Sequence, residues 1–360
     1  MTQLLVDATA LGDDSAFRGI GTYVRHLLAG LAERPGLAVT ALCRQGTALP
    51  PGVSGVPLRR IAPGRFRPLE HEVLLPLDLL RQRADVFHSP ALSPPWRCRS
   101  PWVQTLHDVI PLVVDDPELE VERRRWRRHA ERYRRADAIV AVSRYSADVG
   151  ISVLGLDPRR VEVVPHGVDP GFHPPAGGLS ERPEHLLLVG EYSRRKGYPE
   201  AFAVVGALAQ LGYPHRLRVM GRIAPWVQPA VDAVVSEAPV PERIELLGFV
   251  DDLVAEYQQA QVLLMSSRYE GFGFPVLEAM ACGTPVVAFA NSSLSEVVGD
   301  AGILVPDGDV RAMVQVVGSL LDDEARWADL SARGLERAKE FSWQKSVTAH
   351  AELFERLRMN

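Results

Sequence analysis

The sequence predicts two doubly wound α/β domains, each with a parallel sheet that is covered by helices on both faces. The chain has 360 residues, about twice the length of an average domain. Short apolar runs rich in Val, Ile and Leu alternate with helical patterns along its whole length, which is typical of parallel strands buried on both faces. A composition of 46% hydrophobic and 24% charged residues excludes disordered, collagen-like and coiled-coil chains.

The first domain is expected over residues 1–169. Each of its strands is a short apolar run, and helical patterns lie between the runs. The expected strands are Leu4–Ala8, Val39–Cys43, Asp85–His88, Trp102–Leu106, Ala138–Val142 and Val161–Val164. Because strands and helices alternate, the strands are expected to pair in parallel through right-handed crossovers.

The second domain is expected over residues 170–340, after a Pro- and Gly-rich linker that begins at Asp169. Its expected strands are His185–Val189, Arg216–Met220, Ile244–Leu247, Val262–Met265, Pro285–Phe289 and Gly302–Val305, with helices at Asp252–Gln259 and Phe274–Ala281. A last helix, within residues 341–360, is compatible with either domain. Because open parallel sheets bind ligands beyond the carboxyl ends of their strands, two facing domains would place a site in the cleft between them.

Charge, apolar runs and cysteine content limit the compartment and the partners that can be expected for this protein. The chain lacks a signal-peptide pattern and any run of 18 apolar residues, so a cytoplasmic protein is expected. Cys43, Cys98 and Cys282 are widely spaced, which predicts reduced residues and no zinc site or disulfide framework. Residues 1–169 carry 23 basic and 20 acidic side chains (+3), whereas residues 170–360 carry 17 and 25 (−8), which favours different partners for the two domains.

Gly19 and Gly21 lie in the segment Phe17-Arg-Gly-Ile-Gly-Thr-Tyr, which follows the first strand and opens a helix. Glycines let a backbone approach a ligand closely, and a helix N-terminus presents unpaired N–H groups to an anion. A nicotinamide-dinucleotide site is disfavoured, because Val24 stands where the third glycine of Gly-x-Gly-x-x-Gly belongs. A tight turn without a ligand is the structural alternative.

His107 directly follows the expected strand Trp102–Leu106. The carboxyl end of a strand is where ligands bind, so His107 is a candidate site residue, and a satisfied core histidine is the alternative. Asp108 either orients the imidazole or caps the next helix.

Arg194, Arg195 and Lys196 lie in the loop after the first strand of the second domain. Three consecutive cations repel one another unless water or an anion neutralises them, and phosphates bind at such loops. Lys196 is one of three lysines among 40 basic residues, which indicates that a compact point charge suits this position. A solvated charged loop is the alternative.

The most specific motif is Glu270-Gly-Phe-Gly-Phe-Pro-Val-Leu-Glu278. Pro275 suits the first turn of a helix, so the preceding loop delivers the positive end of that helix to an anion. Glu278 lies one turn inside an apolar helix and needs a hydrogen-bonding partner, which ribose hydroxyls would supply. Glu270 is expected to be free to face another part of the same ligand. The pattern fits a sugar nucleotide that meets the loop residues Gly271, Phe272, Gly273 and Phe274.

Two further segments have simpler interpretations. Asp307-Gly-Asp309 has the Asp-x-Asp spelling of a metal site but lies in a turn before a helix, where Asp is an ordinary N-cap, so no metal is expected. Residues 122–135 hold eight arginines and two glutamates. On a helix they form a basic face that either contacts an anionic membrane or acidic acceptor, or is simply solvated. Nucleic-acid binding is not expected, since a domain with a net charge of +3 lacks a broad basic field.

At these motifs the chain resembles the retaining glycosyltransferases of family 4, group 1 enzymes with the GT-B fold, and among them mannosyltransferase-like members of polysaccharide assembly. The likeness covers nearly the full length, with weaker matches at residues 141–146, 164–169 and 295–298. It implies two facing Rossmann-like domains, an acceptor-binding one over 1–169 and a donor-binding one over 170–340. It also implies that the helix in 341–360 crosses back to the first domain.

The resemblance assigns roles to the matching residues. Arg195 and Lys196 would neutralise the leaving diphosphate, Glu270 would contact the donor sugar, and Glu278 would contact the ribose. In the first domain, Gly19 and Gly21 would lie near phosphate and acceptor, and His107 beside the transferred sugar. Two positions depart from the family pattern: an arginine and an asparagine common in relatives are replaced by Glu191 and His166.

The activity implied is transfer of a hexose, mannose by best match, from a nucleotide diphosphate sugar to a hydroxyl of a glycan, lipid-linked or small-molecule acceptor. Retention, metal independence and the absence of a bound cofactor are implied too, with GDP-mannose or a UDP-sugar as co-substrate. Catalysis would then consist of stabilising the departing diphosphate and positioning two sugars. Alternatives are a sugar phosphorylase, a nucleotide-sugar epimerase, or a silent sugar-nucleotide binding protein.

Overall fold

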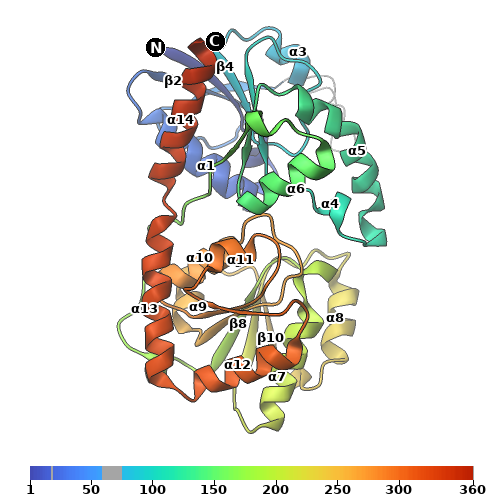
Figure 1. Ribbon diagram of the computed structural model, residues 1–360, viewed down its shortest axis with the longest axis vertical. Helices are drawn as coiled ribbons and strands as arrows, with labels where there is room; N and C mark the ends of the chain where they lie inside the picture. The colour runs from blue at the N-terminus through green and yellow to red at the C-terminus, as the bar shows by residue number, and fades with distance from the viewer. Residues whose placement is uncertain (18, 59–74, 360) are drawn as a thin grey trace. The chain divides into compact units, whose positions relative to one another are not determined.

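The computed structural model describes residues 1–17, 19–58 and 75–359. The chain forms two compact units (Figure 1). The first holds Met1–Gly167 together with Trp343–Asn360, and the second holds Val168–Ser342.

The first unit is built on a seven-stranded sheet in which every described pair of neighbouring strands is parallel. The order is β3-β2-β1-β4-β5-β6-β7, so the chain reverses direction across the sheet between β1 and β4. The strands are β1 Thr2–Asp7, β2 Leu37–Cys43, β3 Ser54–Pro57, β4 Val86–Ser89, β5 Trp102–Leu106, β6 Ala138–Ala141 and β7 Val161–Val163. The point of reversal is where ligands of doubly wound sheets bind.

Helices cover the sheet of the first unit. They are α1 Gly19–Ala32, α3 Leu75–Leu79, α4 Ile110–Val113, α5 Glu120–Arg135, α6 Arg144–Leu154 and α14 Trp343–Met359, with 3₁₀ turns at Thr9–Gly12, Asp14–Phe17, Pro117–Leu119 and Pro158–Arg160. The last helix, α14, lies along α1 (Figure 1), where Arg34 donates to Thr348 Oγ1 at 2.9 Å. The C-terminal residues of the chain therefore complete the first unit.

The second unit has a six-stranded parallel sheet of the same kind. Its order is β10-β9-β8-β11-β12-β13, so here the chain reverses between β8 and β11. The strands are β8 His185–Val189, β9 Arg216–Met220, β10 Ile244–Gly248, β11 Val262–Met265, β12 Val286–Phe289 and β13 Ile303–Val305. The helices are α7 Tyr198–Gln210, α8 Gln228–Ser236, α9 Leu253–Gln259, α10 Phe274–Ala281, α11 Leu294–Val298, α12 Val310–Leu321 and α13 Glu324–Glu340, with 3₁₀ turns at Leu179–Glu181, Arg194–Lys196 and Pro241–Arg243.

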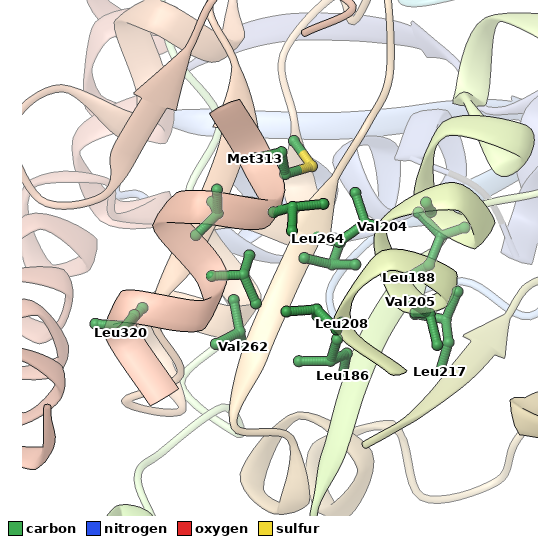
Figure 2. Packing of buried hydrophobic residues seen from close by; sticks show 14 of the residues in the cluster. Leu186, Leu188, Val204, Val205, Leu208, Leu217, Val262, Leu264, Met313 and Leu320 are labelled. Carbon is green, nitrogen blue, oxygen red and sulfur yellow. The ribbon is translucent and has the colours of Figure 1, made fainter. Parts of the chain in front are cut away.

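One face of this second sheet packs against α7 and α12. Leu186, Leu188 and Leu264 point from the strands toward Leu208 of α7 and Met313 of α12 (Figure 2). These side chains are at most 1% exposed. The apolar runs predicted as strands are therefore buried, as expected of parallel strands covered on both faces. Because the strands are held in the core, the polar loops that follow their carboxyl ends have defined positions.

These sheets confirm the predicted fold class, and two local features differ from expectation. The edge strand β3 was not predicted, because Ser54–Pro57 has no apolar run and is largely exposed. Gly19 and Gly21 do not precede their helix but lie in the first turn of α1. A Cβ on Gly21 would lie 2.3 Å from the Ser15 carbonyl oxygen, so close backbone packing by itself requires a glycine there. Cys43, Cys98 and Cys282 are free thiols.

Candidate active site

The loops after β8 and β11 are joined at the reversal point of the second sheet. The Arg268 backbone N–H donates to the Arg195 carbonyl at 2.7 Å, and Ser266 Oγ donates to the Lys196 carbonyl at 3.1 Å. Gly197 allows this contact, since its φ is +66° and a Cβ would lie 2.1 Å from the Ser266 carbonyl oxygen. Neighbouring strands thus bring together residues about seventy positions apart in the chain, as expected for a doubly wound sheet.

The side chains of these loops form a buried ionic cluster. Lys196 Nζ donates to Glu270 Oε1 at 2.6 Å, and Arg195 Nη1 lies 3.4 Å from Glu270 Oε2. Lys196 and Glu270 are each less than 10% exposed. Burial alone would raise the pKa of Glu270, but the charges of Lys196 and Arg195 outweigh it and lower that pKa. The cluster therefore has two cations on one carboxylate, a net positive site suited to an anion.

Glu270 is consequently not free, as the sequence had suggested, but is paired with both cations. The spacing of the motif gave no sign of this contact, because it depends on which strands are neighbours. A second unexpected contact holds the Glu270 backbone, whose N–H donates to Ser292 Oγ at 2.9 Å. Ser292 follows β12 and has a φ of +43°, which is uncommon for a residue other than glycine and often marks a functional site.

Hydrogen bonds from the Ser293 side chain hold the glycine-rich loop before α10 in place. Ser293 Oγ lies 2.8 Å from the carbonyl oxygens of both Glu270 and Phe272, and Gly273 is the N-cap residue of α10. The rings of Phe272 and Phe274 meet edge to face, 5.5 Å apart between centroids. The loop Gly271–Phe274 therefore leads directly into the positive end of a helix, as predicted from Pro275.

Glu278 lies on α10 and is bonded to a residue that the sequence did not single out. Tyr257 of α9 donates from its hydroxyl to Glu278 Oε2 at 2.6 Å. Burial of Glu278 and the nearby Asp169 charge raise its pKa to about 7, although the Tyr257 hydrogen bond opposes them. A hydroxyl-bearing ligand at Glu278 would therefore bind most tightly above neutral pH.

In the first unit, His107 is buried at the end of β5. Its Nε2 lies 2.8 Å from the Pro90 carbonyl oxygen, which can only accept, so Nε2 carries the proton and Nδ1 is left as an acceptor. Burial lowers the pKa of His107 to about 4, so the ring is neutral at physiological pH. Asp108 accepts from the Ile110 N–H at 3.0 Å and so forms an Asx turn around Val109, the N-cap residue of α4.

A cluster that the sequence did not reveal surrounds Tyr23 of α1. The Tyr23 hydroxyl lies 2.8 Å from His350 Nε2 and 3.1 Å from Thr105 Oγ1, which in turn lies 2.8 Å from His88 Nε2. The ring of His166 packs 4.8 Å from the Tyr23 ring. The histidines of this cluster are His88 of β4, His350 of α14 and His166, which lies near the end of the segment Met1–Gly167. They are far apart in the sequence, and only the fold brings them together.

Other predicted features have structural roles. Asp309 is the N-cap of α12 and accepts from the Ala312 N–H at 2.9 Å, as expected, while Asp307 accepts from Asn291 Nδ2 at 2.6 Å. Over residues 1–17, 19–58 and 75–359, no group of His, Cys, Asp and Glu is arranged to hold a metal ion. Within the same ranges, no helix is both long and apolar enough to cross a membrane.

Helix α5 has the two faces that its sequence predicts. Trp126 and Tyr133 are buried and their rings stack 5.3 Å apart, while Arg125, Arg127 and Arg128 are exposed. These three arginines form no ion pair within the described part of the chain. The outward face of α5 therefore carries positive charge that no described carboxylate neutralises.

Two family models match the chain. The one described as Glycosyltransferase Family 4 matches residues 17–172, and the one described as Glycosyl transferases group 1 matches residues 183–323. A D-inositol 3-phosphate glycosyltransferase of Geodermatophilus obscurus is 31% identical over 383 residues, covering 91% of this chain and 82% of the relative. The O-antigen chain mannosyltransferase B of Escherichia coli is 36% identical over 171 residues, covering 46% of this chain and 44% of the relative.

Solved structures give the same answer for the fold. A sucrose-phosphate synthase from Thermosynechococcus elongatus matches with a TM-score of 0.83 at 22% identity over 99% of both chains. Anabaena HepE, solved in complex with UDP and glucose, matches with a TM-score of 0.74 at 18% identity over 99% of both chains. The fold is GT-B. With the family models and the full-length relative, these findings show that the chain belongs to the group 1 glycosyltransferases of family 4, which use nucleotide-sugar donors.

Proposed function

We propose that the protein transfers a hexose from a nucleotide diphosphate sugar to an acceptor hydroxyl with retention of anomeric configuration. The observation that carries this proposal is the cluster of Arg195 with the buried Lys196 and Glu270, which lies at the reversal point of the second sheet. A buried lysine beside a partly exposed arginine is suited to a diphosphate, because a low dielectric strengthens the attraction of the lysine for the charge that develops as the diphosphate leaves.

The chemistry needs no protein nucleophile. The acceptor oxygen attacks the anomeric carbon from the front face while the bond from that carbon to the diphosphate oxygen breaks, and the acceptor proton passes to the departing diphosphate. Lys196 and Arg195 stabilise the diphosphate charge, and Glu270 holds Lys196 in place and accepts from hydroxyls of the donor sugar. The positive end of α10 adds to the same charge stabilisation.

His107 is proposed to accept a hydrogen bond from the transferred sugar through Nδ1. Its Nε2 is engaged by the Pro90 carbonyl, and its lowered pKa keeps Nδ1 unprotonated across the physiological range. Gly19 and Gly21 are proposed to face phosphate and acceptor from the first turn of α1.

A mannose-like donor sugar is proposed from the mannosyltransferase likeness, and GDP-mannose or a UDP-sugar is the proposed co-substrate. Metal independence is proposed because Asp307 and Asp309 are both engaged in structural hydrogen bonds. We therefore expect activity to survive EDTA. The unpaired arginines of α5 support a peripheral contact with an anionic lipid surface or acidic acceptor.

A thermal-shift panel of nucleotides and sugar nucleotides tests the proposal. A ligand that binds the native state at 100 times its Kd stabilises it by about 2.7 kcal/mol, which raises Tm by several degrees. Absence of a shift with every nucleoside diphosphate would contradict a donor site. Turnover of a shifting donor without any added acceptor would instead favour a phosphorylase or an epimerase, and binding without turnover a silent protein.

A further inference from the structure

Tyr257 and Glu278 form an isolated pair of polar groups between α9 and α10. Tyr257 is fully buried, and its hydroxyl makes the only hydrogen bond to the Glu278 carboxylate within the described residues, at 2.6 Å to Oε2. The second carboxylate oxygen, Oε1, has no partner there. The pair is therefore asymmetric, with one oxygen held by the protein and one available to a ligand.

This asymmetry has a physical consequence for binding. A glutamate on a helix surface samples several rotamers, and fixing such a side chain costs up to about 2 kcal/mol. A hydrogen bond from a rigid, buried tyrosine orders the glutamate side chain when the protein folds. Ligand binding therefore does not have to order it. Tyr257 thereby presents Oε1 in one direction.

The position of Tyr257 is itself fixed by Arg182. The guanidinium is 7% exposed, lies 4.9 Å from the centre of the Trp327 ring, and donates to the carbonyls of Ala260 and Cys282 at 2.7 and 3.1 Å. These carbonyls follow the last turns of α9 and α10, where the negative ends of both helices attract a cation. Thr284 Oγ1 also donates to the Tyr257 carbonyl, at 2.6 Å. Arg182 and Thr284 thus hold the two helices that carry the pair in register.

We propose that Tyr257 is a positioning residue that orients Glu278 toward the ribose of the donor, and that it thereby selects ribonucleotide over 2′-deoxyribonucleotide diphosphates. The inference rests on the proposed function and on the ribose contact that the family resemblance implies for Glu278. A ribose hydroxyl donates to Oε1, and a deoxy ligand cannot form this hydrogen bond to a charged group, so the deoxy ligand is penalised.

The test measures the Kd of UDP and GDP, and of their 2′-deoxy analogues, for the wild type and Tyr257→Phe. We expect Tyr257→Phe to weaken ribonucleotide binding about tenfold, the effect of one hydrogen bond to a charged group, and to change deoxynucleotide binding about twofold or less. Tyr213→Phe is the matched control, because Tyr213 donates to Asp322 at 2.5 Å elsewhere in the same unit and should leave all four Kd values unchanged.

The pH profile separates positioning from a merely structural role. The titratable groups that face Glu278 are Tyr257, Asp169 and Cys282, and the charge of Arg182 acts on Cys282. The Tyr257 hydroxyl is the one that lowers the pKa of Glu278, so Tyr257→Phe should move the midpoint of ribonucleotide affinity to higher pH. A structural role would weaken binding at every pH and leave the midpoint where it is.

The outcomes separate the inference from the proposed function. If the wild type binds no nucleoside diphosphate, the proposed function fails. If the wild type prefers ribonucleotides and Tyr257→Phe keeps that preference, or if the wild type has no preference, the inference is overturned. Should Tyr257→Phe not fold, Thr284→Val loosens the Tyr257 backbone while keeping its hydroxyl, and a loss of about threefold in the ribo/deoxy ratio is expected; an unchanged ratio would count against the inference.

Discussion

The two units have the same sheet topology but opposite chemistry at the point where the strand order reverses. In the first unit, that region holds a cluster of uncharged side chains, with His88 and Tyr23 linked through Thr105, and the carboxylate of Asp7 at the end of β1, which accepts from Thr9. In the second, it holds the ions of Lys196 and Glu270. The neutral cluster is fully buried and its groups bond one another, so it holds α1, β4, β5 and α14 together, whereas the ionic cluster includes the partly exposed Arg195. One fold therefore carries two kinds of polar cluster at corresponding places in its sheets.

The largest expected effect is a loss of stability of the first unit at acidic pH. Burial lowers the pKa of His107 and His350 to about 4, from 6.5 in an unfolded chain, so below pH 6.5 the unfolded state takes up protons that the folded state excludes. Stability is therefore lost as pH falls from 6.5 toward 4, by about 4 kcal/mol at pH 5 for the two residues together. Urea unfolding of the wild type at pH 7 and pH 5 measures this change in the free energy of unfolding.

A control variant sharpens this acid effect. His173 is exposed and lies in the second unit, so His173→Gln should keep the pH dependence of the wild type, whereas His350→Phe should reduce it. Equal stability of the wild type at pH 7 and pH 5 would show that the cluster is not neutral and buried, and the contrast between the units would disappear.

The next effect concerns the ionic cluster of the second unit. Lys196→Ala should lower kcat by about 10²–10³-fold, because it removes one buried electrostatic donor from the departing diphosphate. The matched control is Lys339→Ala, since Lys339 is an exposed lysine of the same unit paired with Glu336. Turnover of Lys196→Ala within a few-fold of the wild type would refute the role assigned to this lysine.

A smaller effect has the opposite pH sign to that of the histidines. The folded state raises the pKa of Glu278 to about 7, so above pH 4.5 the folded state retains a proton that the unfolded state loses. Stability of the ligand-free protein is therefore lost as pH rises from 4.5 to 7, and Glu278→Gln should recover about 2 kcal/mol at pH 8. Urea unfolding of this variant at pH 8 and pH 5 is the check. A gain of the same size at pH 5 would point to packing and not to titration.

The smallest effect belongs to the outward face of α5. Removing one cation near an anionic surface costs about 1 kcal/mol, so Arg127→Gln should weaken pelleting with phosphatidylserine vesicles at low salt about fivefold. Arg159→Gln is the control, since Arg159 is also exposed but is already paired with Asp157. If the wild type does not pellet even at low salt, the membrane contact is excluded.

Most of the sheet strands were predictable because parallel strands buried on both faces are continuous apolar runs. Leu186 and Leu264 illustrate this, since both are fully buried. The strand Ser54–Pro57 was not predictable, because an exposed edge strand needs no continuous apolar run. The loop cations and both motif glutamates were also identifiable, but not their pairing. The contacts of Glu270 with Lys196, and of Glu278 with Tyr257, depend on strand order and helix register, which no local spacing encodes.

The return of α14 to the first unit has a consequence for the order of folding during synthesis. The second unit is one continuous segment, Val168–Ser342, and is complete before the last helix leaves the ribosome. The first unit, although made first, must wait for His350 to reach Tyr23 across more than three hundred residues of chain. The N-terminal unit can therefore be completed only after the whole second unit has been synthesised, and a nascent chain that stops short of α14 exposes its unfinished core to chaperones and proteases.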